Sequence, residues 1–369
     1  MEVGMRENIV SAAKRIIIKV GTSLLVKDSK LQTYFITHLA QQIVQLRARG
    51  KECIVVTSGA VGLGAELNHK GKTPNRTEQQ ALAAIGQSRL MQAYDHIFAQ
   101  NDLMTAQVLI TRDDIQSRHN YVAIANTLKQ LVNWHVVPII NENNAISIEA
   151  TAIGDNDTLA ALIASQAQAD LLVLLTCVDG LIDYRANQVV ETVTNIEQQA
   201  AELVRQEKTE LGTGGMATKL QAARIVNESG IAMLIANGQQ PYVMTELLQG
   251  ANIGTLFCPS KKNLYGKKSW IAFGADCRGE VHIDHGAQVA VCERGKSLLA
   301  SGVVQVVDHF SRGDTVALFC QGQRIGRGIT HYSSTELEQV KGCQVSYIDK
   351  LFTGKLPAEV IHRDNLALL

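Results

Sequence analysis

The sequence predicts an α/β protein with a mainly parallel sheet sandwiched by helices, followed by a small C-terminal β-barrel-like domain. Short apolar runs, many of them β-branched, alternate with longer helical patterns over the first two thirds of the chain. These runs are almost continuously apolar, as in parallel strands that are covered on both faces. After about Pro259 the pattern changes to short strands separated by turn residues, which is typical of small β-barrels.

The large sheet begins with Arg15-Ile-Ile-Ile-Lys-Val20, and each later strand is a similar short run. Further strands are expected at 52–57, 106–111, 136–140, 170–175 and 231–236, and helices at 31–49, 77–100, 121–134, 157–168 and 216–229. In the last third, strands are expected at 279–284, 288–292, 303–307, 315–320 and 325–329. Strands that alternate with helices indicate a parallel sheet, whose functional groups gather where strand ends open into loops.

The length of 369 residues fits two domains. A polar and basic stretch, 260–268, reads as a linker between them. We therefore expect one domain over 1–262, a linker over 263–274 and a second domain over 275–369.

The charges exclude binding that depends mainly on bulk charge, because 35 Lys and Arg balance 35 Asp and Glu. The 275–369 segment is also balanced, with ten Lys and Arg against eleven Asp and Glu, which argues against nucleic acid as its partner. The seven cysteines form no C-x-x-C pair. The longest apolar stretch, Leu171 to Leu175, is far too short to span a membrane. We expect a cytoplasmic protein without a membrane segment.

Four loops carry residues suited to chemistry. They are Lys19-Val-Gly-Thr-Ser23, the segment 57–64 (TSGAVGLG), the pair Asn141-Glu-Asn-Asn144 and Gly154-Asp-Asn-Asp157, and the segment 211–219 (LGTGGMATK). Glycines beside a helix start leave backbone N–H groups free for an anion, and lysines add positive charge. Each loop alone also has a structural explanation, such as tight packing, helix capping or a surface turn. Two lysines, two glycine-rich loops and a carboxylate cluster together predict phosphoryl transfer.

With these residues in view, the chain resembles the glutamate 5-kinases (gamma-glutamyl kinases) of the amino-acid kinase family. The resemblance lies in IIKVGTS at 17–23, VVTSGA at 55–60, AIGQSRL at 84–90, VPIINEN at 137–143, GDND at 154–157 and GTGGMATK at 212–219. The tail, with FSRGD at 310–314 and GRG at 326–328, resembles the PUA domain appended to many of these kinases.

The resemblance implies that ATP phosphorylates the side-chain carboxylate of L-glutamate to glutamyl 5-phosphate, the first step of proline biosynthesis. Lys19 and Lys219 would contact the transferring phosphoryl group, and Asp157 would hold both lysines in place. Asp155 would organise that loop or the metal, which is Mg²⁺ held through the ATP phosphates. The resemblance also implies a dimer or tetramer, feedback by proline, and transfer of the labile product to the next enzyme.

The resemblance also implies which residues bind the two substrates. Glutamate would be bound by Ser58, Gly59, Asn144 and Asn156. ATP would be bound by Lys19, Gly21, Thr176, Cys177, Thr213, Gly214, Gly215, Met216, Ala217, Thr218 and Lys219.

Two of these positions depart from the family pattern, because Asn144 and Cys177 stand where aspartates are expected. A carboxylate at 144 would attract the substrate ammonium group by on the order of 4 kcal/mol at close range and intermediate dielectric. The amide of Asn144 can still accept a hydrogen bond. We therefore expect weaker glutamate binding or altered feedback by proline, unless Glu142 compensates.

The sequence leaves three alternatives open. The first is another amino-acid kinase, acting on aspartate, acetylglutamate or carbamate. The second is an RNA-binding protein that uses the PUA-like domain. The third is an inactive kinase that acts as a regulator, against which the presence of Lys19, Asp157 and Lys219 speaks.

Overall fold

A computed structural model describes residues 2–65, 74–147, 155–183, 185–199, 215–260, 264, 266–351 and 357–369. The chain divides into two compact units, here called unit 1 and unit 2. Unit 1 comprises Met1–Ile115 and His119–Asn263, and unit 2 comprises Gln116–Arg118 and Leu264–Leu369. The domain boundaries expected from the sequence, at 262 and 275, stay a prediction, and residues 261–263 lie outside the described part.

Unit 1 is built on an eight-stranded sheet with the strand order β10-β12-β11-β7-β1-β4-β6-β5. The six strands from β11 to β5 run parallel, and β12 is antiparallel to β11. The mainly parallel sheet predicted from the sequence is therefore confirmed. The strands are β1 (Arg15–Val20), β4 (Glu52–Val56), β5 (Met104–Ile110), β6 (Val136–Glu142), β7 (Leu171–Thr176), β10 (Thr192–Val193), β11 (Ala232–Asn237) and β12 (Thr255–Phe257), and two small ribbons pair β2 (Val26–Lys27) with β3 (Lys30–Leu31) and β8 (Ile182–Asp183) with β9 (Gln188–Val189).

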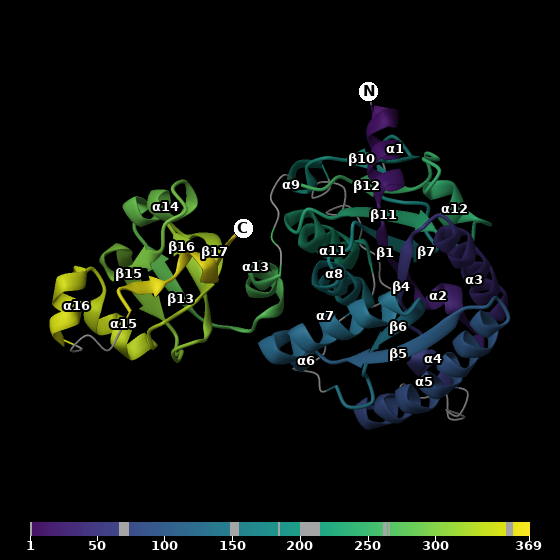
Figure 1. Ribbon diagram of the computed structural model, residues 1–369, viewed down its shortest axis with the longest axis horizontal. Coiled ribbons are helices and arrows are strands. Elements are labelled where there is room, and N and C mark those ends of the chain that lie inside the picture. Colours follow the sequence, from purple (N-terminus) through teal and green to yellow (C-terminus); the bar gives the residue numbers. More distant parts are fainter. Residues whose placement is uncertain are drawn as a thin grey trace. The chain divides into compact units, whose positions relative to one another are not determined.

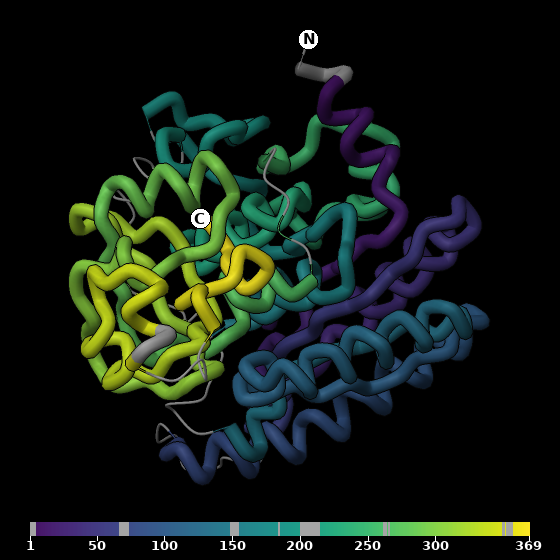
Figure 2. Tube along the Cα trace, turned by 60° about the vertical axis from the view of Figure 1, so that its left-hand side comes forward, coloured from purple at the N-terminus to yellow at the C-terminus, as the bar shows by residue number. Residues whose placement is uncertain are grey.

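Helices cover both faces of this sheet. The helices α8 and α11 pack on one face and α3 on the other, with α5 beside α3 (Figure 1). The helices of unit 1 are α1 (Glu2–Ala12), α2 (Thr22–Leu25), α3 (Thr33–Ala48), α4 (Ala60–Gly64), α5 (Arg76–Ala99), α6 (Arg112–Gln116), α7 (Arg118–Asn133), α8 (Asn156–Gln166), α9 (Ile196–Gln199), α11 (Met216–Glu228) and α12 (Val243–Leu247). The helix α1 lies at the periphery beside β10 and β12 (Figures 1 and 2), where the Arg6 guanidinium donates to Asn252 Oδ1 at 2.9 Å.

The central strand β1 distributes its side chains between the two faces. Ile16, Ile18 and Val20 join the aliphatic core under α3 and α5. Successive side chains of a strand point to opposite faces, so Ile17 and Lys19 face the side of α8 and α11. A lysine near the carboxyl end of a buried strand is thereby aimed at the first turn of α8.

The helices α4 and α5 approach each other more closely than side chains would allow. A Cβ atom built on Gly86 of α5 would lie 1.8 Å from the carbonyl oxygen of Ala60, and one on Gly64 of α4 would lie 2.0 Å from that of Leu82. Because these neighbours are backbone atoms, they cannot turn away as a side chain can. Glycine at both positions therefore allows the close contact that sets the position of α4 and of the loop before it.

We expect Gly86→Ala to destabilise unit 1 by about 3 kcal/mol or more, since overpacking a tight contact costs about 1–3 kcal/mol and occasionally more. Thermal unfolding followed by circular dichroism measures the loss. Gly215→Ala is the matched control, because a Cβ there would meet nothing within 4 Å. Equal melting temperatures for the two variants would contradict the expectation.

Unit 2 contains a five-stranded mixed sheet with the order β15-β13-β16-β17-β19, which confirms a separate small sheet domain. Its strands are β13 (Cys277–Ile283), β15 (Val303–Val307), β16 (Thr315–Cys320), β17 (Gln323–Ile329) and β19 (Leu366–Leu368), and β14 (Leu298–Leu299) pairs with β18 (Glu359–Ile361). Its helices include α13 (Lys267–Ser269), α14 (His285–Cys292), α15 (Ser334–Val340) and α16 (Val345–Leu351). Val281, Val316 and Leu318 lie at the centre of its core.

One expected strand is wrong. Residues 288–292 belong to the helix α14, whose N-cap Asp284 accepts a hydrogen bond from the backbone N–H of Ala287 at 2.7 Å. The alternation of Gln288-Val-Ala-Val-Cys292 resembles a strand, but a capped helix start three residues upstream overrides it. His285 therefore opens a helix, while His282 lies in β13 with Nε2 3.2 Å from Glu280 Oε2.

Candidate active site

The expected site residues come from the carboxyl ends of neighbouring parallel strands. Lys19 lies near the end of β1, Thr176 ends β7, and Ser58 follows β4. After Lys19 the chain turns at Gly21, whose N–H donates to Leu175 O of β7 at 2.9 Å. Parallel strands bring these ends to one edge of the sheet, so residues more than 150 positions apart become neighbours.

The loop after β4 is held by a hydroxyl and a glycine. Ser58 Oγ donates to the carbonyl oxygen of Val20 at 2.8 Å and thereby ties the ends of β4 and β1 together. Gly59, the N-cap of α4, has φ of +92° in the left-handed region, and a Cβ on it would lie 2.8 Å from a methyl group of Val26. A larger residue would therefore move the loop that carries Ser58.

Three consecutive polar residues at the start of α8 make different contacts. Asp155 caps the helix: its Oδ1 accepts from the N–H groups of Asp157 and Thr158, both at 2.8 Å, and its Oδ2 accepts from Thr158 Oγ1 at 2.8 Å. Asn156 Nδ2 donates to Thr57 O at 2.8 Å and to Asn141 Oδ1 at 3.1 Å. The helix start is thereby bound to the loop that follows β4 and to the end of β6, whereas the carboxylate of Asp157 faces Lys19 and Lys219.

Asp157 holds two lysines from opposite oxygens. Its Oδ1 lies 2.5 Å from Lys19 Nζ, and its Oδ2 lies 3.2 Å from Lys219 Nζ. Thr218 Oγ1 also donates to Oδ2, at 3.0 Å. The three charged residues are only 1% (Asp157), 9% (Lys19) and 6% (Lys219) exposed. We call Lys19, Asp157 and Lys219 the ion triad.

The ion triad has an electrostatic signature. Burial by itself raises the pKa of the Asp157 carboxyl group, but the charges of Lys19 and Lys219 lower it, as do hydrogen bonds from Lys19 and Thr218. The balance leaves the pKa of Asp157 below its ordinary value. The carboxylate is therefore ionised at neutral pH and neutralises only one of the two positive charges beside it.

Besides Lys19 and Gly21 at the end of β1, the described residues expected to bind nucleotide lie at the end of β7 and at the start of α11. Gly215 is the N-cap of α11, and Met216, Ala217, Thr218 and Lys219 form its first turn. Cys177 is exposed after β7, with its Sγ 3.0 Å from Ser23 Oγ. Thr213 and Gly214 lie outside the described residues. A helix N-terminus beside two lysines is a favourable place for phosphate groups.

A cavity of about 750 Å³ unites most of these groups. The expected site residues that line it are Lys19, Gly21, Ser58, Gly59, Asn144, Asp155, Asn156, Asp157, Thr176 and Lys219. Cys177, Gly215, Met216, Ala217 and Thr218 do not line it, although Thr218 contacts the ion triad. This cavity is the candidate active site.

The cavity also contains residues that the sequence did not single out. Arg76, Gln79 and Gln80 reach it from the first turns of α5. The sequence marks these residues only as the start of a helix. Whether that helix lines the cavity depends on the tertiary fold.

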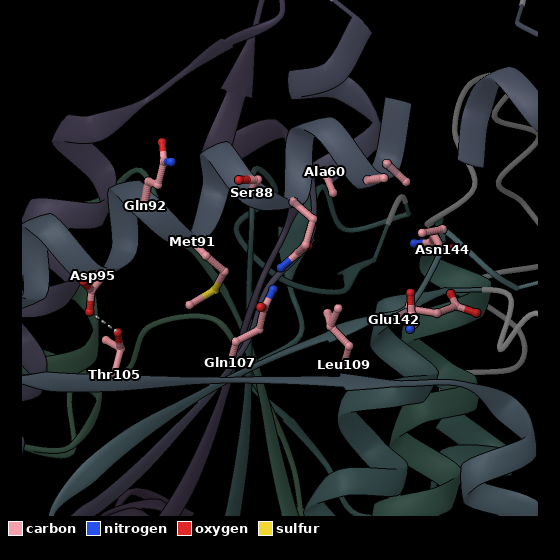
Figure 3. A pocket seen from close by; sticks show the side chains of 15 residues that line it. Ala60, Ser88, Met91, Gln92, Asp95, Thr105, Gln107, Leu109, Glu142 and Asn144 are labelled. Atoms are coloured by element: carbon pink, nitrogen blue, oxygen red, sulfur yellow. Dashed lines mark hydrogen bonds between the residues drawn. The ribbon is translucent and has the colours of Figure 1, made fainter. Parts of the chain in front are cut away.

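A second cavity of about 650 Å³ lies next to the first and shares Ala60, Glu142 and Asn144 with it (Figure 3). Its walls come from α5 and β5, where Thr105 Oγ1 donates to Asp95 Oδ1 at 3.1 Å. Gln87 lines it and accepts a hydrogen bond from Asn141 Nδ2 at 2.8 Å through its Oε1. Hydrogen bonds between the side-chain amides of Gln87, Asn141 and Asn156 thus link the second cavity to the candidate active site.

No group of three or more His, Cys, Asp or Glu in the described part of the chain is placed to hold a metal ion. Both oxygens of Asp155 are engaged in the helix cap, and those of Asp157 face the lysines. The donor set therefore fits Mg²⁺ bound mainly by nucleotide phosphates and not by a protein cage. Within the described residues, no helix is long and apolar enough to cross a membrane.

Comparison with known proteins shows which family the chain belongs to. The model of the amino acid kinase family matches residues 14–237, and the PUA domain model matches residues 279–352. The glutamate 5-kinase of Thermoanaerobacter sp. (strain X514) is 44% identical over 363 residues, which cover 96% of this chain and 98% of that protein. The glutamate 5-kinase of Syntrophotalea carbinolica is 40% identical over 375 residues, which cover 99% of this chain and 100% of that protein.

Among solved structures, the carbamate kinase from Giardia lamblia bound to AMP-PNP superposes with a TM-score of 0.50 at 18% identity. The match covers 68% of this chain and 100% of that one, and it supports the fold alone. The resemblance inferred from the sequence is confirmed. The chain therefore belongs to the amino acid kinase family and carries a C-terminal PUA domain.

Proposed function

We propose that this chain is a glutamate 5-kinase, which transfers the terminal phosphoryl group of ATP to the side-chain carboxylate of L-glutamate. The observation that carries the proposal is the ion triad in the wall of the cavity. The activity named for relatives at 40% and 44% identity over nearly the whole chain supports the choice of glutamate. Aspartate, acetylglutamate and carbamate are therefore not favoured as acceptors, and neither is an RNA-binding or purely regulatory role.

The ion triad explains how the transfer is accelerated. Lys19 and Lys219 present positive charge where the moving phosphoryl group accumulates negative charge. Because Asp157 fixes both Nζ atoms, the two charges are positioned before the substrates bind. The attacking carboxylate is already ionised near neutral pH, so the reaction requires no general base.

We propose that glutamate lies beside Ser58, Gly59, Asn144 and Asn156 and that ATP lies along the ends of β1, β7 and α11. The shared cavity supports this arrangement, since it brings all four acceptor-side residues next to the ion triad. Mg²⁺ would be held by the ATP phosphates, where it would neutralise phosphate charge and orient the terminal phosphoryl group.

The product is an acyl phosphate, which water hydrolyses readily, so we propose that it passes directly to the next enzyme of proline synthesis. Feedback by proline and assembly into a dimer or tetramer follow from the resemblance to the family. ATP as co-substrate and seven free thiols support a location in the cytoplasm.

A coupled ADP assay tests the proposed function. ADP should form with ATP, Mg²⁺ and L-glutamate, and added hydroxylamine should trap the acyl phosphate as a hydroxamate. Aspartate, acetylglutamate and carbamate should give little ADP. Faster turnover of any of these three would overturn the assignment, and repeating the assay with proline tests the feedback.

Asn144→Asp is expected to lower the KM for glutamate by about ten-fold, which corresponds to about 1.4 kcal/mol. Asn144 lines the cavity, and its side chain forms no hydrogen bond with another described residue. A carboxylate there would attract the substrate ammonium group. Glutamate saturation curves at fixed ATP measure the change, and an unchanged or raised KM would refute it.

A further inference from the structure

The cavity is lined by three cationic side chains among the described residues: Lys19, Lys219 and Arg76. The first two share Asp157 and face the phosphoryl end of the site. Arg76 forms no ion pair with any described carboxylate. A glutamate substrate brings a second carboxylate, on its α carbon, which needs a partner of its own.

Arg76 is held in place at the start of α5. Its Nη2 donates to the carbonyl oxygen of Ser147 at 2.6 Å, and Gln80 Nε2 donates to the same oxygen at 3.0 Å. Ser147 is buried, so this carbonyl is a fixed anchor. The guanidinium has five N–H donors, and this contact uses one. The side chain itself is exposed, so the other donors are accessible to a ligand.

The position of Arg76 is unfavourable for the helix. As the first residue of α5 it places a positive charge at the positive end of the helix dipole. The nearest carboxylate in sequence, Glu78, is already engaged in a capping box, where its Oε2 accepts from Asn75 N at 2.8 Å. Arg76 therefore gains nothing from the dipole of its own helix, and this favours a role for its charge outside the helix.

We propose that Arg76 binds the α-carboxylate of the amino-acid acceptor and thereby selects acceptors that carry one; this rests on the proposed function. The γ-carboxylate of glutamate then faces the ion triad, and the α-carboxylate pairs with the guanidinium, whose planar fork suits two carboxylate oxygens. The positive charge of Arg76 and the positive end of the α5 dipole both attract the α-carboxylate. The ammonium group of the substrate then faces Asn144, which is neutral. Binding of the amino acid therefore depends more on its α-carboxylate than on its ammonium group.

The experiment compares two acceptors and two variants of the full-length chain. L-Glutamate and its α-amide, L-isoglutamine, differ only in the charge of the α-carboxyl group and share the reacting γ-carboxylate. Arg76→Gln removes the cation, and Arg76→Lys keeps it without the fork. Lys129→Gln, an exposed lysine on α7 outside both cavities, is the control for loss of one positive charge.

For Arg76→Gln we expect the KM for glutamate to rise at least about ten-fold, since a hydrogen bond to a charged group contributes that much. The KM for ATP should stay within two-fold of the unmodified value, because Arg76 is assigned to the acceptor and not to the nucleotide. The melting temperature should not fall, because the substitution removes a positive charge from the positive end of the helix dipole. The KM for isoglutamine should change less than two-fold, and Arg76→Lys should restore part of the glutamate affinity. Lys129→Gln should match the unmodified protein.

Two results would overturn the role of Arg76. One is a glutamate KM within two-fold of the unmodified value in Arg76→Gln, and the other is an equal rise for glutamate and isoglutamine. Failure of the proposed function looks different, because the unmodified protein itself would then form no glutamate-dependent ADP.

Discussion

Replacing Lys219 by Met is expected to lower kcat for glutamate-dependent ADP formation by about 10³-fold or more. A single cation placed at a transferred phosphoryl group is worth about 10³–10⁵ in rate in related chemistry. Lys219 Nζ is buried and aligned by Asp157, so no solvent cation can take its place. Methionine fills a similar volume, and Lys19 still neutralises Asp157 in the variant, so the fold should persist.

The measurement is a steady-state ADP assay with melting temperature as the check on folding. Lys129→Met, on the exposed face of α7, removes the same charge away from the cavity and should leave kcat unchanged. Lys219→Arg should recover little activity, because its longer planar head cannot occupy the same buried point beside Asp157. A folded Lys219→Met variant with kcat within ten-fold of the unmodified protein would exclude the proposed role of Lys219.

Asp157→Asn is expected to destabilise unit 1 by about 3–5 kcal/mol, because it leaves two buried ammonium groups without their shared carboxylate. For a unit of this size the melting temperature should fall by roughly 6–20 °C. Asp102→Asn, an exposed aspartate, serves as the control and should shift it little. A melting temperature within 2 °C of the unmodified protein would contradict a stabilising ion triad.

The same variant carries a pH dependence whose sign follows from the lowered pKa of Asp157. The unfolded chain has an ordinary aspartate pKa near 3.8, and the folded chain has a lower one. The stabilisation is therefore fully present above pH 3.8 and is lost as the pH falls through the folded pKa. The difference in melting temperature between the unmodified protein and Asp157→Asn should be constant from pH 8 to 5 and should shrink in acid. A difference that grows in acid would be inconsistent with this linkage.

Much of unit 1 was predictable because its strands are buried on both faces. Runs such as Leu171–Thr176 are apolar at nearly every position, which is typical of parallel strands buried on both faces, and their alternation with helical patterns identified them. Helix boundaries were predicted to within a few residues, and the one wrong strand, 288–292, shows that a local cap can outweigh alternation. That β7 lies beside β1 follows from the fold class and is not indicated by any particular residue.

The candidate site was predictable only as a set of loops. Lys19 stood out near the end of a strand, and Asp157 and Lys219 stood out near helix starts. The resemblance to the family linked the three. One carboxylate, that of Asp157, binds both lysines. This depends on distances in the folded chain, which cannot be read from the spacing of residues in the sequence. Arg76 was marked in the sequence only by a helix start. Its proposed role depends on its hydrogen bond to the carbonyl of Ser147, 71 positions away, and on its place in the cavity wall.

The strand order has a consequence for how such an enzyme changes over time. From β1 the sheet grows outward in one direction through β4, β6 and β5, and in the other through β7, β11 and β12. The first half carries the proposed acceptor residues Ser58, Gly59, Arg76 and Asn144, and the second carries the nucleotide residues from Thr176 to Lys219. In the proposed assignment, the acceptor residues and the nucleotide residues thus lie on separate stretches of chain that meet at β1 and α8. Under the proposed assignment, a change at Asn144 or Arg76 alters the acceptor side and leaves the nucleotide-side residues unchanged.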